Sequence, residues 1–173
     1  MSDLEEYSTT LEDESREIRG ALLADTIRVL DPDEPLCVLA TVSVKEAVAA
    51  MMAKRRAAVL IVDADRRLAG IFTERDVLTR VVAPGLEPAA TPLGEVMTRR
   101  PEALSIGDRV AFAVNRMSVA GYRTIPLVDA DQRPVGVVTV NHFIKWMADL
   151  FPEDVLNLRP GDALKRPTEV DAG

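Results

Sequence analysis

The sequence predicts a mixed α/β (α+β) fold built from two copies of one β-α-β-β-α unit, packed face to face. The first observation is an internal repeat: after a shift of 66 residues, positions 41–82 match positions 107–148 at 11 of 42 residues without a gap. The second observation is that both copies show the same succession of helical and strand-like patterns. The third is composition, because 47% of the 173 residues are hydrophobic and only 4% are aromatic. A real, mainly aliphatic core is therefore expected.

An amphipathic helix is predicted near the start of each copy. Apolar residues spaced i, i+3, i+4 and i+7 lie on one face of a helix, so that this face packs on a core. The residues with this spacing are Val44, Ala47, Val48 and Met51 in the first copy and Val110, Ala113, Val114 and Met117 in the second.

Two short strands and a second helix follow in each copy. The apolar runs are too short for helices and are rich in branched residues, which favours buried strands joined by polar turns. The expected ranges are 58–62 and 125–128 for the first strands, 68–72 and 135–138 for the returning strands, and 74–82 and 140–150 for the helices. One unit alone leaves a sheet face uncovered, so two copies are expected to pack together.

The chain divides into four predicted segments. They are an acidic, partly helical N-terminal segment (1–24), with a helix expected over 15–23, a first repeat (25–85), a second repeat (86–152) and an irregular tail (153–173). The net charge of −7 comes from the ends, because residues 21–150 hold 16 acidic and 16 basic residues. A neutral core is a poor footprint for duplex nucleic acid, so nucleic-acid binding is not expected. Neither end is long enough for an effector domain, so a regulated partner is expected on another chain.

The sequence also predicts a cytoplasmic protein with no membrane association. The longest aliphatic run covers residues 57–62, far short of the ~20 residues that a membrane span needs. The N-terminus is acidic where a signal peptide is basic. The single cysteine, Cys37, is expected to be a small buried residue in a reducing compartment.

Three short motifs, carried by two repeats that stand in register, resemble a pair of CBS domains. This regulatory module was first named for cystathionine β-synthase. The motifs are Gly70-Ile71-Phe72-Thr73-Glu74-Arg75-Asp76, Leu127-Val128-Asp129 after Pro126, and Val96-Met97-Thr98. The resemblance covers roughly residues 25–152. It implies two repeats related by a pseudo-two-fold axis, a stand-alone module of bacterial type that forms a homodimer, and adenosyl ligands bound in two clefts between the repeats.

The segment Thr73–Asp76 is the first candidate ligand site. It lies where a strand meets a helix, and the free N–H groups there favour a phosphate. The Asp76 carboxylate is suited to ribose hydroxyls and the Arg75 guanidinium to a phosphate. The same Thr-x-x-Asp spacing also forms a helix capping box without any ligand. The resemblance implies that the site comprises Thr73, Glu74, Arg75 and Asp76, completed by Leu104, Tyr122, Arg123 and Thr124.

The second candidate site departs from the family pattern. Thr139 keeps the hydroxyl, but His142 stands where the acid belongs, and histidine is a poor substitute for a ribose-binding carboxylate. The resemblance implies that its other wall comes from Val38, Arg56, Ala57 and Ala58. This site is therefore expected to be weaker, altered or empty.

The leading hypothesis is a non-catalytic regulatory module that binds AMP, ADP, ATP or S-adenosylmethionine and signals to a partner protein. No cofactor or metal is expected, and an enzyme is disfavoured because His142 is the only histidine and no glycine-rich phosphate loop is present. The alternative is a ligand-free dimerisation scaffold, in which Thr73 and Asp76 only cap a helix.

Overall fold

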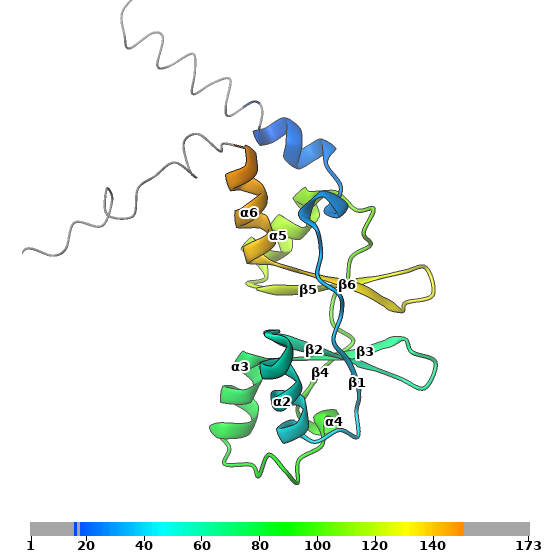
Figure 1. Cartoon of the computed structure of the whole chain (residues 1–173), viewed down its shortest axis with the longest axis vertical. Helices are drawn as coiled ribbons and strands as arrows, with labels where there is room; N and C mark the ends of the chain where they lie inside the picture. The colour runs from blue at the N-terminus through cyan, green and yellow to red at the C-terminus, as the bar shows by residue number, and fades with distance from the viewer. Residues whose placement is uncertain (1–15, 17, 151–173) are drawn as a thin grey trace, which may run out of the picture.

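The computed structural model describes residue 16 and residues 18–150, which form two lobes stacked one above the other (Figure 1). The first lobe contains β1 (Cys37–Leu39), α2 (Val44–Lys54), β2 (Ala58–Val62), β3 (Leu68–Thr73), the short α3 (Glu74–Asp76) and the π-helical η2 (Val77–Val82). The second lobe contains α5 (Val110–Val119), β5 (Thr124–Val128), β6 (Pro134–Thr139) and α6 (Val140–Leu150). The predicted mixed fold with two repeated units is confirmed.

The two sheets have the same strand order. In the first lobe β1 pairs in parallel with β2, which pairs with β3, and β3 pairs with the short β4 (Thr98–Arg99). In the second lobe β5 pairs with β6, and single bridges extend this hairpin on both sides. These bridges join Leu104 to Leu127 in parallel and Asp33 to Val137 in antiparallel fashion. A shift of 66 residues therefore maps the first three strands of one sheet onto the other, while the pairing of the fourth is offset by one residue.

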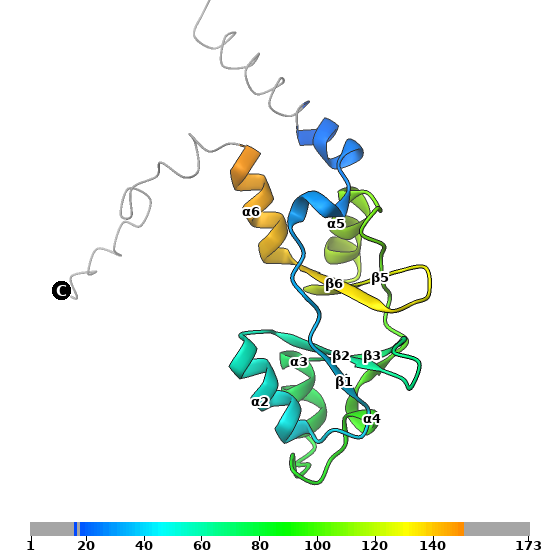
Figure 2. The same ribbon diagram turned by 45° about the vertical axis from the view of Figure 1, so that its right-hand side comes forward.

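Two helical turns pack on one lobe although the chain continues from them into the other lobe. The turn η1 (Ile27–Leu30) precedes β1 but lies on the second lobe, and α4 (Leu93–Val96) precedes α5 but lies on the first (Figures 1 and 2). Backbone bridges at Thr26–Arg109 and Ser43–Pro92 hold both turns. The chain thus crosses twice between the lobes. The segment boundaries drawn along the sequence remain predictions, and they do not describe this exchange.

Each lobe has its own aliphatic core, and a third cluster lies where the sheets meet. The predicted helix face is confirmed in α2, where Val44, Ala47 and Met51 are buried. Between the lobes Ala58, Leu60 and Ile71 are buried, with Leu68 and Val137 packed against them. The hairpins also meet through a hydrogen bond from the Leu68 N–H to the Gln132 carbonyl (2.8 Å). The sheets therefore face each other. Helices cover only one apolar face of each sheet, so the other face is buried against the opposite sheet.

Two local expectations need revision. Cys37 is exposed, because β1 is an edge strand whose alternation turns Cys37 and Leu39 outward. Partial desolvation of the sulfur still raises the pKa of the Cys37 thiol, and the positive charge of Arg66 opposes this rise. The helix expected over 74–82 becomes π-helical from Val77 onward. The helix expected over 15–23 is seen at residues 18–24, while residues 15 and 17 lie outside the described part of the chain.

Candidate functional site

The first motif forms a complete helix cap at the start of α3. Asp76 Oδ2 accepts hydrogen bonds from the Thr73 backbone N–H (2.9 Å) and the Thr73 hydroxyl (2.8 Å). Thr73 Oγ1 in turn accepts a long bond from the Asp76 N–H (3.4 Å). The other carboxylate oxygen, Oδ1, pairs with the Arg80 guanidinium at 3.1 Å, and Asp76 is only 8% exposed. A ribose at Asp76 would therefore share a carboxylate that already has partners.

The other residues predicted for this first site lie in several places. Glu74 and Arg75 are exposed, and the Glu74 N–H donates to the Ala57 carbonyl of the same lobe. Tyr122 is 39% exposed at the entrance to β5, while Thr124 pairs with Thr139. In the part of the chain that the structure describes, no hydrogen bond or ion pair joins residues 73–76 to residues 122–124.

The second motif forms an equivalent cap with an imidazole in place of a carboxylate. His142 Nδ1 accepts a hydrogen bond from the Thr139 N–H (3.0 Å) and lies 2.9 Å from the Thr139 hydroxyl. Because Nδ1 is an acceptor here, the neutral ring carries its proton on Nε2. His142 Nε2 faces Asp33 Oδ2 at 3.5 Å, and the same carboxylate oxygen forms an ion pair with Arg56. The motif is thereby linked to Asp33, which lies on the segment that crosses between the lobes, from η1 to β1.

A cavity of about 340 Å³ opens at this second motif, between the two lobes. It brings together four residues of the predicted second site, namely Arg56, Ala57, Ala58 and Thr139. Arg123 and Thr124, predicted for the first site, line it as well. The remaining wall is formed by Asp33, Glu34, Leu36, Arg55, Val137, Val140 and Asn141. Two predicted residues are outside this lining: Val38 packs against the first core, and His142 reaches the wall through Asp33.

The cavity carries three guanidinium groups and two carboxylates. Arg55, Arg56 and Arg123 are the cations, and Asp33 and Glu34 are the acids. Such a set favours an anionic ligand without making the wall uniformly basic. Sequence reasoning missed Asp33 and Glu34. No motif or periodic pattern along the chain marks either residue.

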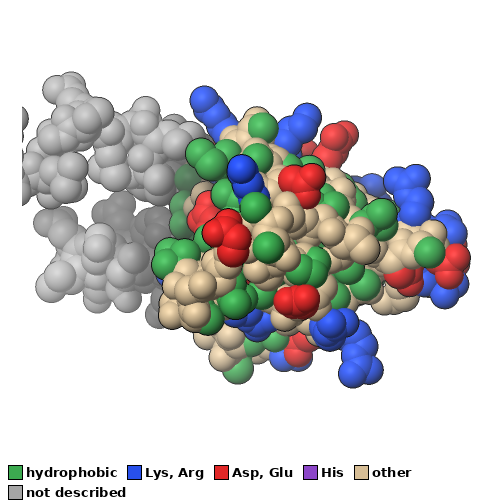
Figure 3. Space-filling view, turned by 90° about the horizontal axis from the view of Figure 1, so that it is seen from below, with side chains coloured by type: hydrophobic (Ala, Val, Ile, Leu, Met, Phe, Trp, Pro, Cys, Tyr) green, Lys and Arg blue, Asp and Glu red, His purple; other side chains and the backbone are tan. Residues whose placement is uncertain are grey.

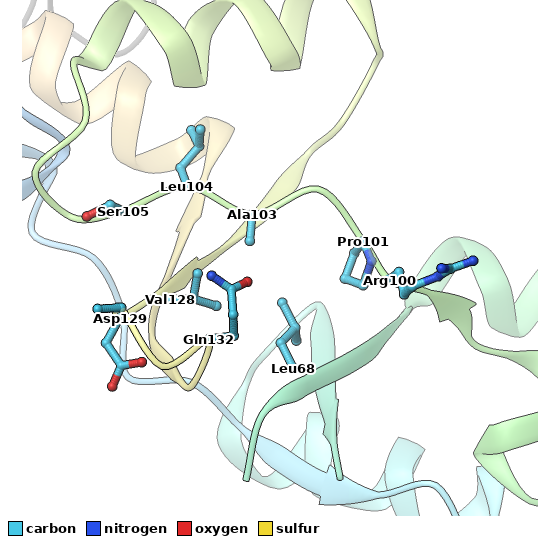
Figure 4. Close-up of a pocket in the computed structure, with 10 residues that line it drawn as sticks. Leu68, Arg100, Pro101, Ala103, Leu104, Ser105, Val128, Asp129 and Gln132 are labelled. Carbon is cyan, nitrogen blue, oxygen red and sulfur yellow. The ribbon is translucent and has the colours of Figure 1, made fainter. Parts of the chain in front are cut away.

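A second hollow, of about 570 Å³, lies beside the hairpin turns (Figure 4). Leu104, predicted for the first site, lines this hollow together with Leu68, Val128 and Gln132. Its charged lining residues are Arg100 and Asp129, and one Asp129 oxygen already accepts from the Asp131 and Arg133 N–H groups. Neither the Thr73–Asp76 motif nor the Thr139–His142 motif contributes to it, so it is the weaker candidate for a nucleotide site.

Comparison with known proteins agrees with this architecture. A model of the CBS domain matches the chain twice, at residues 29–83 and 93–149. The chain belongs to the CBS domain family. This CBS pair shares its fold with the CBS domain pair of protein MJ0100 in complex with 5′-methylthioadenosine and S-adenosyl-L-methionine (TM-score 0.65, 23% identity, 71% of this chain and 99% of that one). It also shares it with the CBS domain protein PAE2072 from Pyrobaculum aerophilum complexed with AMP (TM-score 0.65, 21% identity, 76% and 95%).

Two curated relatives of this CBS pair are much longer proteins. The meiotically up-regulated gene 70 protein of Schizosaccharomyces pombe is 33% identical over 110 residues, which are 64% of this chain and 15% of that protein. The CBS domain-containing protein CBSCBSPB2 of Arabidopsis thaliana is 34% identical over 104 residues, or 60% and 19%. The similarity thus spans less than a fifth of each relative.

Two further properties bear on the site. Within residues 18–150, no helix is both long and apolar enough to cross a membrane. The same described residues contain no group of three or more His, Cys, Asp or Glu side chains arranged to hold a metal ion.

Proposed function

We propose that this CBS pair is a non-catalytic regulatory module that binds an adenine nucleotide or related adenosyl ligand between its repeats and signals to a partner protein. The observation that carries the proposal is the cavity between the lobes, where Arg56 and Ala57 of one repeat face Thr139 of the other. A pocket of this kind, with a few convergent polar groups, is a typical small-molecule site. The adenosyl ligands named for two proteins of the same fold support the choice of ligand.

The lining supports each part of such a ligand. Three arginines offer charge-assisted hydrogen bonds to phosphate oxygens. Leu36, Ala57 and Val137 supply apolar atoms for the faces of a base. Because both lobes contribute, a ligand that fits one arrangement of the lobes better than another shifts the population toward it. This is how binding would reach a partner protein in the cytoplasm.

The surface supports a protein partner over a nucleic acid. Seen from below, the end of the molecule shows apolar side chains among scattered acidic groups, with basic groups mainly at the rim (Figure 3). A duplex footprint needs a continuous basic patch, which this face lacks. Leu78 on η2 and Ile144 on α6 stand 66 residues apart and are both exposed. Two equivalent apolar residues on outer helices support the proposed homodimer.

The second candidate function is a ligand-free scaffold. The observation in its favour is the cap at Asp76, whose oxygens have partners without any ligand. In that case the repeats would serve only as a dimerisation module.

Thermal unfolding in the presence of AMP, ADP, ATP or S-adenosylmethionine separates the two candidates. A ligand at about 100 times its dissociation constant stabilises the folded state by ~2.7 kcal/mol, which raises the midpoint by several degrees. Arg56→Ala is expected to reduce that shift, measured from its own ligand-free midpoint, because a cavity guanidinium is lost. The matched control is Arg28→Ala, which removes an exposed arginine of η1 outside the cavity. No shift with any of the four ligands would favour the scaffold.

A further inference from the structure

The two motifs of this CBS pair differ at the position of the acid. Under the 66-residue shift, Asp76 of the first motif corresponds to His142 of the second. Next to the second motif, Asp33 on the segment between η1 and β1 bridges Val137, two residues before Thr139 on β6. The second motif thus has a histidine at the motif position and an acid, Asp33, on the segment that crosses between the lobes.

His142 itself is unable to accept hydrogen bonds from a ribose. Its Nδ1 already accepts from the Thr139 N–H, and its Nε2 carries the proton of the neutral ring and faces Asp33. Ribose hydroxyls donate hydrogen bonds and need an acceptor, the role that a carboxylate serves in nucleotide sites. The motif position of the second cleft therefore lacks this function.

Asp33 supplies a carboxylate at the same place. It lines the cavity, and its Oδ2 lies 3.5 Å from His142 Nε2. The other oxygen, Oδ1, has no hydrogen-bond or ion-pair partner among the described residues, so it is open to a ligand. Its accepting capacity is the one that His142 lacks.

The position of Asp33 is set by its backbone and by two side chains. Its N–H donates to the Val137 carbonyl (3.0 Å), and its carbonyl accepts from the Val137 N–H (2.9 Å). Arg56 and His142 hold the carboxylate from either lobe. Such support holds a binding group in place before the ligand arrives.

We propose that Asp33 is the ribose-binding acid of the second cleft, accepting hydrogen bonds from the 2′- and 3′-hydroxyls of an adenine nucleotide. The proposal rests on the proposed nucleotide-binding function and gives the second cleft a complete set of polar groups in place of a defective one. It makes Asp33 the residue that distinguishes ribose from deoxyribose there.

Calorimetric titration with AMP and 2′-deoxy-AMP tests the role of Asp33. All variants carry Asp76→Ala, which removes the acid at the corresponding position of the first motif. The parent is expected to bind AMP roughly tenfold more tightly than 2′-deoxy-AMP, since one hydrogen bond to a charged group distinguishes them. Asp33→Ala is expected to lower this ratio to about one. The ratio of the two dissociation constants is compared, and not the affinity for AMP alone, because removal of Asp33 also frees Arg56 to bind the phosphate that both ligands carry.

The matched control is Glu34→Ala, which removes the neighbouring acid of the same cavity and should keep the tenfold ratio. If Asp33→Ala does not fold by circular dichroism, the near-isosteric Asp33→Asn replaces it and should lower the ratio to roughly threefold, since charge-assisted bonds are about twice as strong as neutral ones. A ratio unchanged in the Asp33 variant overturns the role of Asp33 while nucleotide binding stands. Absence of AMP binding to the wild-type protein overturns both.

Discussion

At the scale of single residues, the same polar spacing serves as a cap in three places within residues 18–150. Ser43 with Glu46, Thr73 with Asp76 and Thr139 with His142 each place an acceptor at the third helical position, bonded to the backbone N–H of the capping residue. The Ser43 pair lies outside both cavities. Capping alone is therefore sufficient to explain the spacing, and the ligand role of the other two pairs depends on what surrounds them.

Ser43→Ala gives the effect of a cap without a ligand site. Loss of the hydroxyl removes an acceptor for the Glu46 N–H and is expected to lower the free energy of unfolding by about 1 kcal/mol. Chemical denaturation at pH 7 measures this change. Thr41→Ala, an exposed residue just upstream, is the control and should have almost no effect. An equal loss in both variants would contradict the capping role of Ser43.

The same cap predicts a pH dependence. The Ser43 hydroxyl, and then the Ser43 N–H, lower the pKa of Glu46 below its ordinary value. Because the folded pKa lies below the unfolded one, this stabilisation is complete above the unfolded pKa of about 4.3 and is lost as the pH falls through the folded value. The difference between wild type and Ser43→Ala should shrink below about pH 4. Denaturation curves from pH 7 to pH 3 measure it, and a difference that grows with acidification would contradict it.

At the scale of elements, the crossing strands impose glycine on the sheets. A Cβ at Gly70 would lie 2.4 Å from Met97 Sδ and 3.1 Å from the Thr98 carbonyl oxygen. The corresponding Gly136 has Leu127 at 3.3 Å and Pro32 at 3.4 Å. Both glycines lie on the returning strand of a hairpin. The strand β4 passes beside Gly70, and the segment that contains Asp33 passes beside Gly136. The repeated glycine therefore reflects the close approach of the neighbouring segment, through Met97 and the Thr98 carbonyl at Gly70 and through Pro32 and the Asp33 carbonyl at Gly136.

Gly70→Ala is expected to destabilise the protein by ~1–3 kcal/mol, the usual effect of overpacking. The Met97 thioether can move, but the Thr98 carbonyl belongs to paired β4 and must shift with its strand. Urea denaturation measures the loss. The control is Gly20→Ala, whose Cβ would meet nothing within 4 Å in a helical segment and should raise stability by up to ~1 kcal/mol. Equal behaviour of the two variants would exclude close packing at Gly70.

At the scale of the whole molecule, the exchanged turns couple the lobes. Leu93 and Val96 belong to the core of the first lobe, while Ile27 and Leu30 belong to that of the second. Each lobe thus includes buried side chains from a segment that leads into the other lobe. We expect the two lobes to unfold together, since opening of either one removes packing from both connecting segments.

Leu93→Ala and Ile27→Ala test this coupling. Both side chains are fully buried, so each truncation is expected to cost ~2–5 kcal/mol through lost burial and the cavity left behind. Each variant should still unfold in one transition, followed by the fluorescence of Trp146 and by circular dichroism. Leu86→Ala, 40% exposed, is the control and should change stability little. Two separate transitions, of which each substitution moves only one, would show that the lobes are independent.

The sequence by itself determined the repeat, the element order and the spacing of the Thr73–Asp76 cap of this CBS pair. The strand predicted at 58–62 is β2, and the helix predicted at 140–150 is α6. Periodicity, turn residues and capping spacing act over a few neighbouring residues, so they can be read along the chain. The predicted second-site residues Arg56, Ala57, Ala58 and Thr139 meet in one cavity because the family pattern records where two such units face each other.

Only the tertiary structure decided which lobe each turn joins and which side chains complete the cavity. Asp33 reaches the site through its bridge to Val137, and Cys37 is exposed because β1 is an edge strand. Leu104, predicted for the first site, lines the hollow beside the hairpins. The physical reason is the same in each case: pairing between segments far apart in the chain leaves no local periodic pattern, and its geometry appears only when both lobes are packed.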